Sequence, residues 1–296
     1  MGSWTIAIEL TRRELPQGGW SFTGSAQASI EATCLAGLAL ANINASRAGQ
    51  FLLHAQRRDG AWPAFLGDPE ASWTTAPVVP ALTVLNDSSS ARERAMAWIL
   101  NTRGREGHWL WRWKFKISDR QVHFDPDKFG WPWIPGANSW VIPTAFTLVA
   151  LKQFTACARS ELADGRIRTG IDMLLDRACL GGGWNAGNSV VYGVPLAAHV
   201  EPTAIALLAL QDGPRTELVR QSVAWLKARA AELQSVSSLA WAILALFIYQ
   251  ERIHELKERL SGLVGDGARI RNNAALTVVV LALRCGEEIH PFAVLR

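Results

Sequence analysis

The feature that most constrains this chain is a short apolar segment that recurs six times. Each copy ends in an Ala-Leu pair, and each is apolar around nearly its whole circumference when drawn as a helix. A helix of this kind must be buried on every side. The repeat therefore predicts six buried helices, at 31–40, 73–82, 142–151, 201–210, 238–246 and 274–283.

Segments of a second kind alternate with these copies. They place apolar residues three and four apart, with charged residues on the opposite face, which indicates half-exposed helices. Such an alternation fits an inner ring of helices inside an outer ring. We therefore predict an all-α fold, an (α/α)6 toroid of six helical hairpins that forms a single domain over residues 1–296. An open helical solenoid is the alternative. The half-exposed segments lie at 6–15, 47–58, 91–103, 165–177, 214–229 and 251–263.

The loops from outer to inner helices are expected to share a Gly-Trp corner. Glycine allows the left-handed turn that ends a helix, and the tryptophan would cover the corner. Four inner segments also carry a threonine seven places before their final leucine. The corners are expected at Trp20, Trp62, Trp109 and Trp184, and the threonines are Thr33, Thr75, Thr144 and Thr203.

The composition excludes several classes of protein. The net charge of +4 is spread along the chain without a basic block, so nucleic acid is not an expected partner. The N-terminus lacks the uninterrupted apolar stretch of a signal peptide, and the longest apolar runs are too short to span a bilayer. We expect a cytoplasmic protein with reduced core cysteines, a disulfide or zinc site being the alternative. The cysteines are Cys34, Cys157, Cys179 and Cys285.

Residues 47–62 carry a specific motif. They read Arg, three residues, Phe-Leu, three residues, Gln, three residues and Gly-Ala-Trp. This pattern matches the QW motif of squalene/hopene cyclases, and a weaker copy lies at 94–109. The chain therefore resembles the prenyltransferase/squalene-cyclase repeat superfamily over essentially its whole length. QW loops are structural in that superfamily, so the resemblance implies the toroid more directly than a chemistry.

The resemblance also implies an acid motif, DxDDTA, which protonates an isoprenoid. Its best match is the segment HVEPTA at 199–204, where Glu201 falls on the proton-donating aspartate while His199 and Pro202 replace two of the other acids. Glu31 holds the same repeat position in the first inner segment. Glu201 is a candidate general acid, and a capping or packing role is the alternative.

Two inter-helix segments are longer than the others and are expected on the face where the inner helices begin. The first, at 104–140, is an aromatic-rich insertion that would cover the cavity mouth, and the second is a Gly-rich stretch at 181–200. Aromatic and basic residues alternate at 109–116, which suits either a strand-like flap or an aromatic wall. The residues expected to line the substrate site are Glu31, Trp73, Trp111, Trp113, Trp131, Trp133, Trp140, Tyr192 and His199.

The insertion also contains two closely spaced carboxylates, Asp125 and Asp127. They could share a proton and serve as catalytic acids together with Glu201. They could also hold Mg²⁺ with a diphosphate substrate, or form a turn without a special role. Apart from that Mg²⁺ option, the sequence predicts no cofactor and no metal site.

The leading hypothesis is a terpene cyclase-like protein that binds an isoprenoid or other apolar chain in an aromatic-lined central cavity. Acid-initiated cyclisation or isomerisation would be its reaction. One alternative is a non-catalytic toroid that serves binding or assembly, and another is a carbohydrate-active α/α toroid enzyme. One toroid leaves room for a partner subunit that completes the cavity wall, and the apolar ligand leaves room for peripheral membrane contact.

Overall fold

We describe a computed structural model of the chain that covers residues 3–44, 46–85, 89–118, 124–156, 160–265, 267–287 and 290–294. Helices dominate these residues. The inner helices are α2 (Ile30–Asn44), α4 (Thr75–Val84), α7 (Val141–Thr155), α9 (Val200–Ala209), α11 (Val236–Ile248) and α13 (Asn273–Leu283). The outer helices are α1 (Ser3–Arg12), α3 (Ser46–Ala55), α5 (Ser89–Asn101), α8 (Glu161–Asp176), α10 (Glu217–Ala230) and α12 (His254–Val264).

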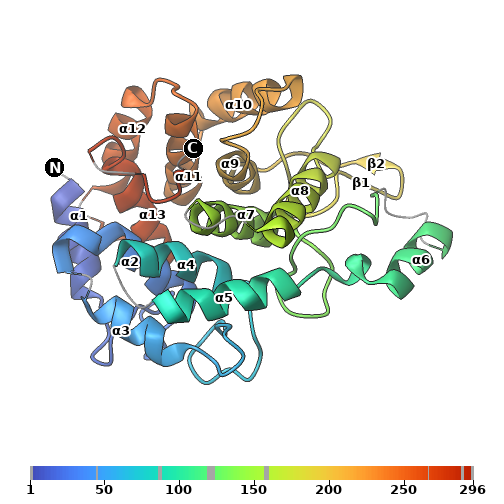
Figure 1. Cartoon of the computed structure of the whole chain (residues 1–296). Coiled ribbons are helices and arrows are strands. Elements are labelled where there is room, and N and C mark those ends of the chain that lie inside the picture. Colours follow the sequence, from blue (N-terminus) through green and yellow to red (C-terminus); the bar gives the residue numbers. More distant parts are fainter. Residues whose placement is uncertain are drawn as a thin grey trace.

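The inner helices form a closed ring. Each contacts the next in chain order, and α13 returns to pack against α2. In Figure 1 the colours follow the sequence around this ring, so that the red helix α13 lies beside the blue helices α1 and α2. The outer helices pack against inner ones from outside, and their exposed faces carry the charged residues. The predicted all-α toroid is therefore confirmed, and the open solenoid is wrong.

At four corners of the ring, a tryptophan ties an outer helix to the next inner helix. Its indole N–H donates to a carbonyl of the outer helix at 2.6–2.8 Å, and its backbone N–H donates to a threonine Oγ1 of the inner helix at 2.8–3.0 Å. Each corner thus satisfies polar groups that burial would otherwise leave unpaired. The pairs are Trp20 with Thr33, Trp62 with Thr75, Trp131 with Thr144 and Trp184 with Thr203.

The expectation that Trp109 forms the third corner is wrong, because Trp131 takes that place. The chain leaves the ring at Gly104 and returns at Gly130, where the N–H of Gly104 donates to the carbonyl of Gly130 at 3.0 Å. Only after this return does a Gly-Trp pair meet the inner helix. A Cβ at position 130 would lie 2.1 Å from the Oγ1 of Thr144, so the close approach requires glycine there.

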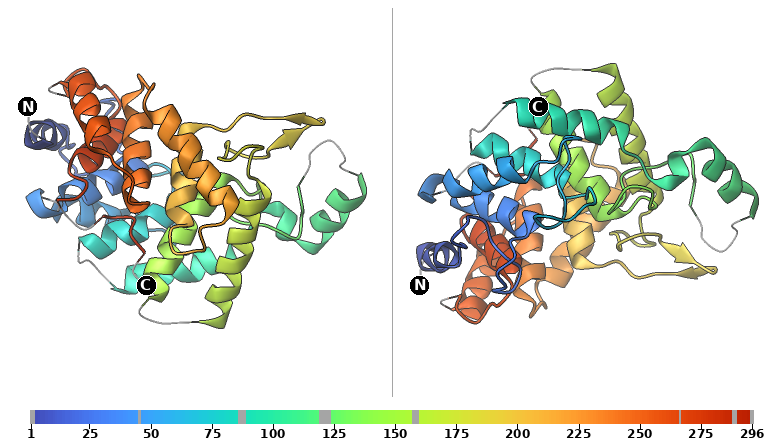
Figure 2. Two further views of the ribbon diagram at one scale, coloured as in Figure 1. Left: turned by 90° about the horizontal axis from the view of Figure 1, so that it is seen from above. Right: turned by 90° about the horizontal axis from the view of Figure 1, so that it is seen from below.

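The excursion between these two glycines projects from one side of the ring (Figure 2). It contains a short 3-10 helix, η1 (Arg105–Gly107), and the helix α6 (Trp109–Ser118). The expected strand-like flap is therefore wrong. The aromatic residues that alternate along the sequence divide between two faces of the helix: Trp111 and Phe115, four apart, share one face, and Trp109 shares another with Trp113.

A two-stranded hairpin projects on the same side as α6 (Figure 2). Its strands, β1 (Val190–Val191) and β2 (Val194–Pro195), pair antiparallel, with Val191 opposite Val194. Strands of two residues are too short to give a period-two signal in the sequence. The hairpin lies in the Gly-rich stretch between a corner tryptophan, Trp184, and α9.

The C-terminal segment fills the centre of the ring from the end where the inner helices finish. The side chain of Phe292 is fully buried and contacts Phe146 of α7 and Trp241 of α11, with ring centroids 5.8 and 5.7 Å apart. Two glutamines hold its backbone: Gln211 donates to the carbonyl of Phe292, and Gln153 donates to the carbonyls beside it. The expected hollow centre is therefore filled at this level.

Three of the four cysteines lie within the described residues. Cys34, Cys179 and Cys285 are buried free thiols, and burial raises the pKa of each. A raised pKa keeps a thiol protonated and unreactive, in line with the expected core role. Cys157 lies outside the described residues.

Candidate functional site

Two glutamates occupy equivalent positions at the ring mouth, by which we mean the end where the inner helices begin. Glu31 is the second residue of α2 and Glu201 the second residue of α9, and these helices stand on opposite sides of the ring. Both side chains are half-buried. Neither carboxyl has a hydrogen bond or ion pair with any residue that the structure describes. The mouth therefore contains two acidic groups without a matching cation among these residues.

The surroundings raise the pKa of both carboxyl groups. Burial is the main cause for Glu31, and the charge of Glu201 adds to it, so that the pKa of Glu31 rises from 4.5 to about 7. Burial also raises the pKa of Glu201. A helix N-terminus favours the ionised form, so desolvation outweighs the helix dipole here.

The two carboxyl groups are electrostatically coupled. Repulsion between two carboxylates is mutual, so ionisation of one opposes ionisation of the other. With a pKa of about 7, Glu31 keeps a substantial protonated fraction near neutral pH. The ring mouth therefore contains a carboxyl group that can donate a proton, together with a second carboxyl group coupled to it.

Aromatic side chains line the mouth beside this pair. Trp73 precedes α4 and packs edge-on against Trp133, with ring centroids 5.0 Å apart. The backbone N–H of Trp73 donates to the carbonyl of Trp133, which fixes the two loops together. Below them, Trp73 contacts Phe146, the first of the residues that fill the ring centre. Both tryptophans are half-buried, so part of each ring remains accessible.

Of the other predicted site residues, several belong to different environments. Trp131 is buried in the third corner, where it has a structural role. Trp111 and Trp113 lie on α6, outside the ring. Tyr192 sits at the hairpin turn with a φ of 51° and is 71% exposed. Glu31 and Glu201 thus lie at the mouth as one coupled pair and Trp73 and Trp133 as another, whereas Trp111, Trp113, Trp131 and Tyr192 lie elsewhere.

The two aspartates of the excursion are engaged in ion pairs. Asp127 pairs with Lys116 and Arg112, and Asp125 pairs with Lys128. Asp125 Oδ1 also accepts the backbone N–H of Asp127, as in a simple turn. Within the described residues, no three His, Cys, Asp or Glu side chains gather closely enough to hold a metal ion.

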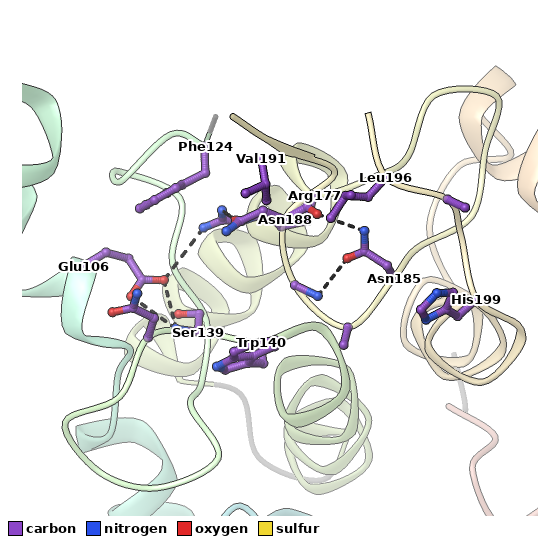
Figure 3. A pocket seen from close by; sticks show the side chains of 14 residues that line it. Glu106, Phe124, Ser139, Trp140, Arg177, Asn185, Asn188, Val191, Leu196 and His199 are labelled. Carbon is purple, nitrogen blue, oxygen red and sulfur yellow. Dashed lines mark hydrogen bonds and ion pairs between the residues drawn. The ribbon is translucent and has the colours of Figure 1, made fainter. Parts of the chain in front are cut away.

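A cavity of about 450 Å³ lies beside the mouth, between the excursion and the hairpin loop (Figure 3). Trp140, which precedes α7, and His199, which precedes α9, both line it. The cavity reaches His199, the residue before α9, and Glu201 is not among the residues that line it. Apolar side chains form much of its wall, namely Phe124, Trp140, Val191 and Leu196, and amides from Asn138, Asn185 and Asn188 add polar groups.

A buried ion pair supports this cavity from behind. Glu106 is fully buried and accepts the backbone N–H of Ser139, while its Oε1 lies 3.9 Å from a guanidinium nitrogen of Arg177. Arg177 also donates to Asn188 and lies over the ring of Phe124 at 4.1 Å. The pair therefore joins the excursion, α8 and the hairpin loop around one space (Figure 3).

Sequence reasoning missed this ion pair. Glu106 lies within the weak QW copy at 94–109 without being one of its defining residues, Arg177 lies in no motif, and the two are far apart in the chain. The sequence shows only that each residue lies near the edge of a long inter-helix segment. That position does not indicate which charged side chains will pair in the folded chain.

No helix among the described residues has the length and apolar character needed to cross a bilayer.

Comparisons with known proteins identify the fold. No protein-family model matches the chain, and no curated protein matches it. An α-amylase from Clostridium perfringens superposes with a TM-score of 0.66 at 10% identity, over 97% of this chain and 98% of that one. A type II terpene cyclase from Scytonema, in complex with merosterolic acid A, gives 0.62 at 16% identity, over 95% of each chain.

A family 8 glycosyl hydrolase from Klebsiella pneumoniae, the endoglucanase Cel10, gives a TM-score of 0.57 at 13% identity, over 94% of this chain and 98% of that one. Two of these three similar proteins are glycosidases by name, and the third is a terpene cyclase. At such low identities the likeness shows the fold alone, and the chain is similar to α/α toroids of both the terpene cyclase and the glycosidase kind.

Proposed function

We propose that the protein binds an apolar, isoprenoid-like ligand at the ring mouth and catalyses an acid-initiated cyclisation or isomerisation. The observation that carries this proposal is the carboxyl group of Glu31. Its pKa of about 7 leaves it partly protonated at neutral pH, opposite a second carboxyl and beside accessible tryptophan rings. A proton donor in aromatic surroundings suits a reaction that generates positive charge on carbon.

The reaction would begin with a proton transfer from Glu31 to one carbon of a ligand double bond. The electron pair of that bond forms the new C–H bond and leaves a cation on the neighbouring carbon. Trp73 and Trp133 would stabilise the cation through their ring faces, and Glu201 in its ionised form would stabilise it through its charge. Loss of a proton to Glu201 then yields an isomer of the substrate, and proton exchange through water restores the first state of the pair.

The adjacent cavity would hold the rest of the ligand. Its apolar wall of Phe124, Trp140, Val191 and Leu196 offers an apolar chain a surface away from water. The volume of about 450 Å³ falls within the usual range for small-molecule sites. This reaction needs no metal or other cofactor, since protonation creates the cation directly.

A diphosphate substrate with Mg²⁺ is a weaker proposal. Asp125 and Asp127 would be its ligands, but their ion pairs with Lys128, Lys116 and Arg112 compete with a cation for the same oxygens.

Glycoside hydrolysis is the second candidate function, and the pair of glutamates favours it too. A glycosidase uses one protonated and one ionised carboxyl group, and a pKa near 7 suits protonation of a glycosidic oxygen. The amides of Asn138, Asn185 and Asn188 could bond sugar hydroxyls, but apolar side chains form more of the cavity wall. We therefore rank it second.

A product screen tests these proposals. The protein is incubated with squalene, geranylgeraniol and geranylgeranyl diphosphate, and in parallel with xylo-, cello- and malto-oligosaccharides, and products are identified by mass spectrometry. We expect an isomeric terpenoid product whose rate of formation declines above about pH 7, as Glu31 loses its proton. Glu31→Gln should abolish the product, whereas the matched control Asp127→Asn should retain it.

Each other outcome has a clear meaning. Cleaved oligosaccharides without terpenoid products would replace the proposal with the glycosidase function. Ligand binding without any product, and unaffected by Glu31→Gln, would indicate the non-catalytic toroid.

A further inference from the structure

The outer face of α6 exposes an unusual number of large apolar side chains. Trp109, Leu110, Trp113 and Ile117 are 73%, 53%, 62% and 57% exposed. In an α-helix with 3.6 residues per turn, these four positions fall within an arc of about 100°. They therefore form one continuous apolar stripe along the helix, which we call the α6 stripe.

Basic residues border the α6 stripe on both sides. Lys114 follows one edge around the helix, and Arg112 and Lys116 follow the other. The helix contains no acidic residue. Asp127 of the following loop pairs with both Arg112 and Lys116, so this border keeps a net charge of +1 from two cations and one carboxylate, and the two basic side chains are 35% and 49% exposed. An apolar stripe with cations on both borders is typical of helices that lie in a membrane interface.

The opposite face of α6 holds the helix in place. Trp111 contacts Phe115, with centroids 6.1 Å apart, and Phe115 contacts Phe124 of the returning chain at 5.3 Å. The guanidinium of Arg105 lies over the ring of Trp111. These contacts orient the helix, so the α6 stripe faces away from Trp111, Phe115 and Phe124. Figure 2 shows α6 projecting beyond the ring in both views.

We propose that the α6 stripe docks the protein on an anionic membrane surface. The two tryptophans would lie at the level of the lipid headgroups, a position that the amphipathic indole prefers, with Leu110 and Ile117 reaching the acyl chains. The basic borders would meet the anionic headgroups.

The size of the stripe argues for a membrane and against a second protein. A helix of ten residues is about 15 Å long. Four side chains on such a helix cannot cover the roughly 800 Å² per partner that a stable protein interface requires. A bilayer sets no such requirement, because insertion of a few aromatic and aliphatic side chains plus electrostatic attraction is sufficient for reversible binding.

Vesicle flotation with the full chain tests the proposal. We compare vesicles of phosphatidylcholine with vesicles that contain about one third phosphatidylglycerol. We expect binding to the anionic vesicles that weakens at high salt, and a loss of roughly tenfold or more in the double variant Trp109→Ser, Trp113→Ser. Lys114→Glu should weaken binding less. The matched control is Leu180→Ser, since Leu180 is 89% exposed but lies in the loop after α8.

Circular dichroism checks that the variants keep their fold, which we expect because both tryptophans are exposed. Absence of binding to anionic vesicles, or equal binding by the double variant, would overturn the proposal. So would a dimer in sedimentation velocity that the double variant abolishes, because a second copy would then cover the stripe. Glu31→Gln should bind vesicles like the wild type, so this result is independent of the proposed catalysis.

Discussion

Tryptophan has opposite uses in the ring and in the excursion. At the four ring corners it is buried, and its indole and backbone N–H groups both donate to neighbouring elements. On α6, Trp109 and Trp113 are mostly exposed. The residue type is the same, and what differs is the position relative to the repeat. A tryptophan after glycine and opposite a threonine builds the toroid, and one on a projecting helix is free for a surface role.

The acidic residues divide in the same way. At the ring mouth, Glu31 and Glu201 are half-buried, have no cation among the described residues and have raised pKa values. In the excursion, Asp125 and Asp127 face solvent and pair with basic side chains. Burial in the ring therefore makes ionisation of Glu31 and Glu201 unfavourable, whereas basic side chains of the excursion neutralise the charges of Asp125 and Asp127.

The largest expected effect separates the two kinds of tryptophan. Trp62→Ala should destabilise the protein by about 4 kcal/mol, because it removes a fully buried ring and leaves the carbonyl of Leu52 without its donor. Trp113→Ala should change the free energy of unfolding by less than about 0.5 kcal/mol. Chemical denaturation measures both, and similar losses would show that α6 is part of the folded core.

The acids provide the next test. The pKa of Glu31 is higher in the folded protein than its usual 4.5, so the folded state binds the proton more tightly and stability falls as the pH rises from about 4.5 to about 7. Glu31→Gln removes this loss. We expect the variant to exceed the wild type by about 2 kcal/mol at pH 8, and to show a smaller advantage at pH 5.

Urea denaturation across this pH range is the measurement, and Asp127→Asn is the control. A wild type whose stability is constant from pH 5 to pH 8 would contradict a raised pKa at Glu31.

A smaller effect is expected from a single hydroxyl group of a corner. Thr144→Val should cost about 1.5 kcal/mol, because the buried backbone N–H of Trp131 loses its acceptor. Thr169→Val on the outer helix α8 is the matched control, since its hydroxyl only donates to a carbonyl of its own helix. Thermal unfolding should rank the first variant below the second, and equal melting temperatures would refute the role assigned to the corner threonine.

The smallest effect concerns the ion pairs of the excursion. Asp127→Asn should change stability by no more than about 0.5 kcal/mol, because Arg112, Lys116 and the aspartate are all well exposed. Any difference in stability between the variant and the wild type should disappear at high salt, because salt screens exposed charges. A loss above about 2 kcal/mol would place these charges among the structural contacts, together with Glu106 and Arg177.

Repetition explains how much could be predicted. The recurrence of the Ala-Leu segments specified the helices and the closed ring, and three of four corners followed from the Gly-Trp pairs. The prediction of the third corner was wrong because its Gly-Trp pattern, at Trp109, lies in the excursion, before the chain returns to the ring at Gly130. Position in the repeat also singled out Glu31 and Glu201, although not their mutual influence. The pair of Glu106 and Arg177 has no repeat counterpart, so only the folded chain reveals it.

The buried Phe292 has a consequence for molecular traffic. Together with Phe146 and Trp241 it obstructs the axis of the toroid, so nothing can thread from one end to the other. Under the proposed function, a ligand bound at the ring mouth would therefore enter and leave from that same end.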